Sequence, residues 1–184
     1  MEQVQYDISY QAKRSRIKVL LRGILIIPHF VLWYILSIGA GLAGIVHWFA
    51  QVITGKRVAG IFTFANNVNA YTTRVMSYTG LMFDEYPGWF EDGGKTPTTY
   101  SLGYVEKCNR LTVLLRIFWM IPAIVIAYFL LFGAYVVLVV AWFAIVITGK
   151  FPRGMFDFSL KVHRYMSQYS AYSSLLTDQY PKFG

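Results

Sequence analysis

Charged residues are scarce in this sequence. Asp, Glu, Lys and Arg make up 14% of the 184 residues and 56% are hydrophobic, whereas an average soluble domain has about 25% charged residues. Residues 23–55 and 117–149 contain no charged side chain at all. So short a chain cannot hide two apolar stretches of this length in a soluble core. The composition therefore predicts an integral membrane protein.

Cysteine and acidic residues are also few. The single cysteine, Cys108, excludes an internal disulfide and gives no metal-ligand spacing. The apolar stretches hold no paired carboxylates and no Ser-His-Asp order is recognisable, so we expect neither a catalytic site nor a metal site. The excess of 17 Lys and Arg over 9 Asp and Glu finds its simplest partner in anionic membrane lipids, and no nucleic-acid partner is expected.

The chain consists of one module in two tandem copies. The segment WFAQVITGK at residues 48–56 returns as WFAIVITGK at residues 142–150, and 142 minus 48 gives an offset of 94. Self-similarity at a fixed spacing is the signature of a repeat architecture. We therefore expect two membrane repeats, residues 1–90 and 98–184, joined by a connector at residues 91–97 into one compact unit.

Each copy begins with a strand pattern. Apolar and polar side chains alternate along residues 4–10, and the counterpart lies near Tyr100, Leu102 and Tyr104. Such alternation indicates a short strand. We expect the two strands to pair at the membrane surface, although two strands alone are only marginally stable.

The apolar stretches are too long for one upright crossing. Each would form a helix of about 50 Å, whereas the hydrocarbon core is about 30 Å thick. With single crossings, the seven basic residues from Lys56 to Arg116 would face the other ten across the membrane, against the usual cytoplasmic bias. We therefore predict an all-α fold with two transmembrane or re-entrant helical hairpins, which bend near residues 39–41 and 133–134.

An amphipathic helix is predicted after each apolar stretch. Apolar and tyrosine side chains recur there every three or four residues, and polar side chains fill the rest of the helical wheel. Such an interfacial helix suits the headgroup plane or the surface of another helix. We expect the stripe to be a seam for a partner helix, formed by Phe64, Tyr71, Tyr78, Phe158, Tyr165 and Tyr172.

The Thr-Gly-Lys segments end the apolar stretches. Glycine closes a helix C-terminus and lysine complements the helix dipole. The glycine-rich run of a nucleotide-binding loop does not precede them. At an anionic leaflet each basic residue contributes about 1 kcal/mol of attraction. We therefore also expect lipid-phosphate contacts from Lys56, Arg57, Lys150 and Arg153, and the two interpretations are compatible.

The order of these motifs resembles a known family. An arginine-bearing apolar run with Ile-Pro is followed by Trp-Phe-Ala, Thr-Gly-Lys, Gly-x-Phe-x-Phe, a tyrosine-rich helix and a closing Asp-x-Tyr-Pro. The pattern is similar to that of the bacterial domain-of-unknown-function family 4389, most strongly in FPRGMFDFSLKVHRY at residues 151–165. The resemblance implies a prokaryotic integral membrane protein and brings no established activity with it.

His47 is the one candidate ligand for a pigment. Ala43 lies one helical turn before it, and a small residue at that spacing leaves room for a flat macrocycle on an axial imidazole. Its counterpart in the second copy is Ala141, so the histidine is not part of the duplicated pattern. A histidine that packs or hydrogen-bonds between helices is the simpler interpretation.

Three functions fit the sequence. The first is a non-catalytic scaffold or accessory subunit that docks on other integral membrane proteins and on anionic lipid. The second is a lipid-binding or transport protein whose two copies form a pseudo-symmetric groove. The third is a haem- or chlorophyll-binding subunit that uses His47; otherwise no cofactor is expected. For all three we expect the bacterial cytoplasmic membrane, with basic loops and both termini on the cytoplasmic side.

Overall fold

The computed structural model describes residues 3–90 and 95–184. Within these residues, two short strands and five helices follow one another. In chain order they are β1 (Gln5–Ile8), α1 (Arg16–Leu25), α2 (Ile27–Thr54), α3 (Ala59–Thr79), β2 (Thr98–Ser101), α4 (Arg110–Thr148) and α5 (Arg153–Ser173). Most of the expected connector at residues 91–97 lies outside the described residues. The predicted helical fold with two copies is confirmed.

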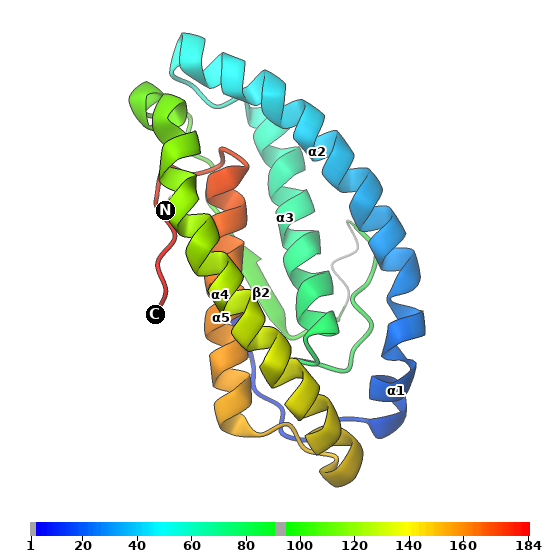
Figure 1. The fold of residues 1–184 in the computed structure, drawn as a ribbon. Coiled ribbons are helices and arrows are strands. Elements are labelled where there is room, and N and C mark those ends of the chain that lie inside the picture. The colour runs from blue at the N-terminus through cyan, green and yellow to red at the C-terminus, as the bar shows by residue number, and fades with distance from the viewer. Residues whose placement is uncertain (1–2, 91–94) are drawn as a thin grey trace.

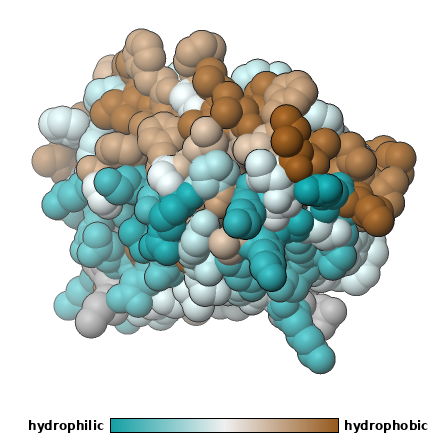
Figure 2. Space-filling model, turned by 90° about the horizontal axis from the view of Figure 1, so that it is seen from below, coloured by the Kyte–Doolittle hydropathy of each residue, from teal (hydrophilic) through white to brown (hydrophobic). Residues whose placement is uncertain are grey.

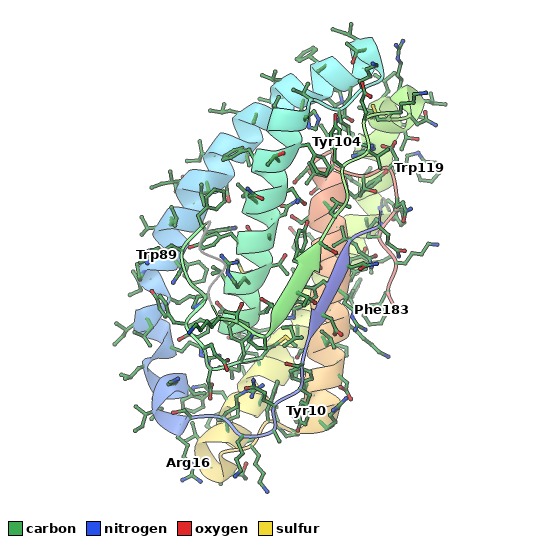
Figure 3. All side chains as sticks on the ribbon, turned by 180° about the vertical axis from the view of Figure 1, so that it is seen from behind. Tyr10, Arg16, Trp89, Tyr104, Trp119 and Phe183 are labelled. Carbon is green, nitrogen blue, oxygen red and sulfur yellow. The ribbon has the colours of Figure 1, made fainter. Side chains whose placement is uncertain are left out.

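The elements are stacked in three layers (Figures 1 and 3). The first layer holds α1, α2 and α4, with α2 and α4 side by side and running in opposite directions. Behind them lie α3, which packs along α2, and α5, which packs along α4. The two strands lie behind α3 and α5. The shorter helices therefore separate the long apolar helices from the sheet.

A pseudo-twofold axis relates the two copies. β1 and β2 pair antiparallel with Tyr6 opposite Tyr100, and these two residues are copies of each other. The same axis relates two isolated backbone bridges near the helix ends, Lys13 with Lys150 and Lys56 with Lys107. Because the axis passes through the strand pair, both copies turn their long helices toward the same side of the molecule.

The predicted hairpins are wrong. Gly39 and Gly41 lie inside the continuous helix α2, and Gly133 lies inside the continuous helix α4. Glycine weakens a helix by only about 1 kcal/mol relative to alanine, which is too little to break backbone hydrogen bonds that have no other partner in apolar surroundings. Two of these glycines instead admit an aromatic ring: the Phe64 ring contacts α2 at Gly39, and the Phe158 ring contacts α4 at Gly133.

The Thr-Gly-Lys segments end the long helices as predicted. Gly55 caps α2 with a φ of 72° and Gly149 caps α4 with a φ of 71°. This left-handed conformation suits glycine because it has no Cβ. Because α2 and α4 are antiparallel, the two caps lie at opposite ends of the helix pair. The carbonyl oxygen of each capping glycine accepts a hydrogen bond from the segment that precedes the first helix of the other copy.

The tyrosine stripe belongs to the chain's own core. Tyr71, Tyr78, Tyr165 and Tyr172 are each at most 2% exposed. Their hydroxyl and ring contacts reach the long helices; for example, Tyr165 donates to the carbonyl oxygen of Ala123 at 2.9 Å. Burial raises the pKa of Tyr71 and of Tyr165 to about 12. These tyrosines therefore form the expected seam against partner helices of the same chain, α1, α2 and α4, and are not available to another protein.

The first layer leaves one side of the molecule apolar. α2 and α4 are long and apolar enough to cross a membrane, by length and composition, yet only 6% and 11% of their most apolar windows are buried within the chain. Figure 2, seen roughly along the helices, shows hydrophobic residues on one half and hydrophilic residues on the other. We call the exposed apolar side of α1, α2 and α4 the apolar face; its members include Ile24, Ile38, Ile53, Phe118, Phe129 and Phe143.

Alanine at the two central glycines tests the continuous helices. A Cβ at Gly39 would lie 3.4 Å from Phe64 Cζ, whereas one at Gly133 would lie 3.1 Å from Phe158 Cζ. We expect Gly39→Ala to stabilise the protein by up to about 1 kcal/mol through helix propensity, and Gly133→Ala to give less or to destabilise. The unfolding midpoint in detergent measures both. Loss of stability in both variants would indicate bends that need glycine.

Candidate functional site

A buried ion pair closes the first copy. Arg22 on α1 donates to Asp84 Oδ1 at 3.0 Å and to the carbonyl oxygen of Tyr78 at 2.5 Å. Its guanidinium also lies 4.2 Å from the centroid of the Tyr78 ring. Burial lowers the pKa of Arg22, whereas Tyr78 and Asp84 act to raise it. An arginine that is only 4% exposed needs these partners, because an unpaired buried charge is strongly destabilising.

The second copy repeats the same contacts. Arg116 on α4 donates to Asp178 Oδ1 at 2.9 Å and to the carbonyl oxygen of Tyr172 at 2.6 Å, and its guanidinium lies 4.4 Å from the Tyr172 ring. These residues were not predicted as a unit from the sequence. The available signal was a charge at the start of each apolar run and the aspartate of each Asp-x-Tyr-Pro motif, both repeated at the same offset.

Each end of the helix pair holds a second buried arginine. At one end, Arg14 donates to the carbonyl oxygens of Leu81 at 3.1 Å and Met82 at 2.5 Å. At the other end, Arg57 lies 3.0 Å from Asp178 Oδ2 and donates to the carbonyl oxygen of Val105 at 3.0 Å. The Arg14 guanidinium therefore stabilises the turn that follows α3. The Arg57 guanidinium stabilises the segment that precedes α4.

These second arginines come from non-equivalent positions of the repeat. The counterpart of Arg14 is Cys108, and the counterpart of Arg57 is Phe151. The Arg14 backbone N–H donates to the carbonyl oxygen of Gly149 at 3.0 Å, two residues before Phe151. In the same way, the Cys108 N–H donates to the carbonyl oxygen of Gly55 at 3.0 Å, two residues before Arg57. Each end thus combines one arginine with one uncharged side chain. The two copies differ here in a compensating way.

Basic side chains gather at both ends of the helix pair. The bridges between Lys13 and Lys150 and between Lys56 and Lys107 bring the two copies together there. We call these groups the basic rims. The first contains Lys13, Arg16, Lys18, Lys150 and Arg153, the second contains Lys56, Lys107 and Arg110, and all eight residues are exposed.

Three of the four expected lipid-phosphate residues lie on these rims. Lys56, Lys150 and Arg153 are exposed. The N–O distance from Lys56 to Glu106 is 2.8 Å and that from Arg153 to Asp157 is 3.0 Å, and exposed pairs of this kind contribute little. The expectation is wrong for Arg57, which is 2% exposed and whose charge is already engaged by Asp178.

His47 is enclosed by the protein. It faces inward from α2 with no exposed surface, and its Nε2 accepts a hydrogen bond from the Val58 backbone N–H at 3.3 Å. It lines neither of the cavities described below. Pigment ligation through His47 stays a prediction that nothing in the described residues tests. Only Nδ1, which has no hydrogen-bond partner among these residues, would be available as the ligand atom.

A groove separates α2 from α4. Its larger cavity has a volume of about 700 Å³, with walls from α2 and α4 and a floor from α3 and α5. A second cavity of about 480 Å³ continues toward the first basic rim. The two cavities share Trp33, Thr72, Ser170 and Ser173. We call the two together the α2–α4 groove.

The two cavities occupy pseudo-symmetric places but differ in shape. On the α2 wall of the larger cavity stand Ser37, Gly41 and Gly44. The corresponding wall of the smaller cavity carries the bulkier counterparts Leu131, Tyr135 and Leu138. The larger cavity therefore exists because the first copy has small residues where the second copy has large ones. This difference in side-chain size was not predicted from the sequence, because it lies at positions where the two copies disagree.

A family model described as a domain of unknown function, DUF4389, matches residues 16–91 and 110–184. The chain belongs to the DUF4389 family. No curated protein and no solved structure matches it. The two matched regions begin at the first residues of α1 and α4. Each DUF4389 copy therefore contains a long apolar helix, the shorter helix behind it and the closing Asp-x-Tyr-Pro motif.

The DUF4389 match separates the two kinds of buried arginine. Arg22 and Arg116 lie inside the matched regions together with their aspartates. Arg14 and Cys108 lie in the segments that precede those regions, whereas Arg57 lies inside. The ion pair that closes each copy is thus internal to the family unit, and the compensating arginine joins one unit to the segment before the other.

Exchange of the two arrangements tests this compensation. Arg57→Phe leaves the buried Asp178 cluster short of one cation, and Cys108→Arg alone adds a third guanidinium to it. We expect each single variant to lower the free energy of unfolding by about 2 kcal/mol or more, and the double variant to recover part of the loss. The coupling energy from a double-mutant cycle measures the effect. Strictly additive losses would contradict the exchange.

Proposed function

We propose that this chain is a non-catalytic membrane scaffold that inserts its apolar face into one leaflet. Its basic rims contact anionic headgroups. The side formed by α3, α5 and the sheet faces the aqueous phase and binds other proteins. The observation that supports this orientation is the direction of the boundary between apolar and polar surface. The boundary runs along the helices (Figure 2), whereas a helix that crosses a membrane has polar surface only at its ends.

Helix length favours the flat orientation. α4 contains 39 residues and is therefore about 58 Å long, nearly twice the ~30 Å hydrocarbon core. Its exposed apolar residues continue from Leu111 to Ile147, so an upright α4 would leave many of them in water. A helix about 10–12 Å in diameter that lies flat fits within one leaflet along its whole length.

The neighbouring helices also oppose an upright crossing. α5 packs along α4 and carries Asp157, Lys161 and Arg164, none of which is buried. If α4 crossed the membrane upright, these charges would lie at the depth of the hydrocarbon, where each costs about 3 kcal/mol. In the flat orientation they remain in water. The apolar face alone then meets the lipid.

The rims supply charge complementarity to a lipid surface. They border the apolar face at both of its ends and contain no exposed cation that would have to enter the hydrocarbon. The flat orientation also leaves every basic residue on one side of the membrane, which was the reason for expecting hairpins. A second copy is a poorer cover for the face, because the chain carries a net charge of +8 and pairing would bring like-charged rims together.

Membrane depth along one helix line tests the orientation. Ile24, Ile38 and Ile53 are exposed at the start, middle and end of the α1–α2 line. Nitroxide labels at single cysteines there, on a Cys108→Ala background, should show similar depths in one leaflet by power-saturation measurements. A label on Lys161, on the polar side, should remain in water. If α2 crossed the membrane, the depths would differ by more than about 10 Å, with the middle label deepest.

A further inference from the structure

The larger cavity of the α2–α4 groove has room that none of the described residues fills. A Cβ added at Gly41 or at Gly44 would meet no atom within 4 Å. Glycine in an exposed helix costs about 1 kcal/mol relative to alanine, so two of them on one wall disfavour the helix unless the space has a use. With Ser37, three positions of this wall are smaller than their counterparts in the second copy.

Two buried donors that border this cavity lack an acceptor. Asn69 and Arg116 line the cavity and are 5% and 3% exposed. Neither Asn69 Nδ2 nor Arg116 Nε makes a hydrogen bond of normal geometry within the described residues, although the Tyr100 hydroxyl interacts with the Asn69 side chain. The Asn69 side chain is held by the Ser170 hydroxyl, which donates to Asn69 Oδ1 at 2.8 Å. Arg22 Nε, the counterpart of Arg116 Nε, also lacks a partner in the described part of the chain, so the feature specific to this place is that Asn69 and Arg116 both border an open cavity, where a ligand rich in acceptor oxygens fits.

The charge around Arg116 points to an anion. Arg57 and Arg116 share Asp178. At the other end of the helix pair, Asp84 and Glu85 both act on the buried Arg14, and the counterpart of Glu85 is the uncharged Gln179. Arg116, which borders the larger cavity, therefore shares the Asp178 carboxylate with a second guanidinium. A phosphate group brings both the missing negative charge and the acceptor oxygens.

The walls identify the rest of the ligand as apolar. Above the polar floor, Trp33, Ile45 and Trp48 on α2 face Ile117 and Met120 on α4. Both helices belong to the apolar face, so the groove opens where acyl chains would lie. A free phosphate ion gains nothing from such walls, whereas the chains of a phospholipid do.

We propose that the larger cavity binds one phospholipid, whose phosphate lies at Asn69 and Arg116 and whose acyl chains pass between α2 and α4 into the leaflet. This inference rests on the proposed orientation, because the lipid reaches the groove from the membrane. The proposed site lies at the end of the groove whose α2 wall carries the small residues of the first copy. The opposite end is narrowed by Leu131, Tyr135 and Leu138.

Filling the cavity with the second copy's own side chains tests the site. The protein purified in mild detergent should carry about one phospholipid by native mass spectrometry and phosphorus assay. The triple variant Ser37→Leu, Gly41→Tyr, Gly44→Leu should carry none. Titration with short-chain phosphatidylglycerol, followed by the fluorescence of Trp33 and Trp48, should show binding weakened at least about tenfold.

Two further variants separate the site from general effects. Asn69→Leu should weaken binding about tenfold, the value of one hydrogen bond to a charged group, with the cavity still open. Leu42→Tyr adds the same ring as Gly41→Tyr, but on the exposed apolar face, and should leave binding unchanged. If the triple variant does not fold, as judged by helicity and melting, Gly44→Leu alone serves the same purpose.

Several results would overturn the proposal. They are a purified protein without phosphorus, a filled variant with undiminished lipid, and displacement of the lipid by excess inorganic phosphate alone, which would mean that the apolar walls contribute nothing. The depth measurement on α1–α2 distinguishes the two proposals. A flat profile without bound lipid removes only the groove site, whereas a spanning profile removes the orientation on which the groove site depends.

Discussion

The buried ion pairs Arg22–Asp84 and Arg116–Asp178 join the apolar layer to the rest of the chain. Arg22 leaves the inner side of α1, which leads into α2, and Arg116 leaves the inner side of α4; both bond to a backbone oxygen in the last turn of the shorter helix and to the aspartate just beyond it. The outer side of the long helices gains nothing from intramolecular packing, since it is exposed. The arginines therefore fix which side of each long helix turns inward, and thereby which side is left for the environment.

The pseudo-twofold axis extends this local constraint to the whole molecule. Because the axis runs through the paired Tyr6 and Tyr100, both long helices must lie on the same side, and their outward surfaces combine into one apolar face. As a result, the surface of the protein is divided along its helices into an apolar half and a polar half. That division, more than the hydrophobicity of either helix alone, leads to the proposal of insertion into one leaflet. Differences between the copies, such as the open wall at Gly41 and Gly44, then add features that a symmetric molecule would lack.

Much of this architecture could be predicted from the sequence, because a repeat and a lack of charge are visible without coordinates. The tandem copies, the paired strands and the glycine caps at Gly55 and Gly149 were all predictable. The hairpins were not, because they were inferred from helix length and from the distribution of basic residues on the assumption that the helices cross the membrane. The partner helices of the tyrosine stripe were not predicted, because periodicity identifies a buried side of a helix but not its partner. Arg57 was expected to contact lipid because a sequence cannot distinguish an exposed cation from one that is paired with Asp178. The groove was not predicted because it depends on differences in side-chain size between aligned positions.

The most direct test of the one-leaflet account is the accessibility of the two opposite ends of the helix pair. Cysteines replacing Lys56 and Lys150, each alone on a Cys108→Ala background, would be treated with a membrane-impermeant thiol reagent in sealed vesicles of known orientation. The account predicts that both positions are labelled from the same side, although they lie at opposite ends of α2 and α4. Labelling of one from the inside and the other from the outside would mean that the helices cross the membrane, and would contradict the account.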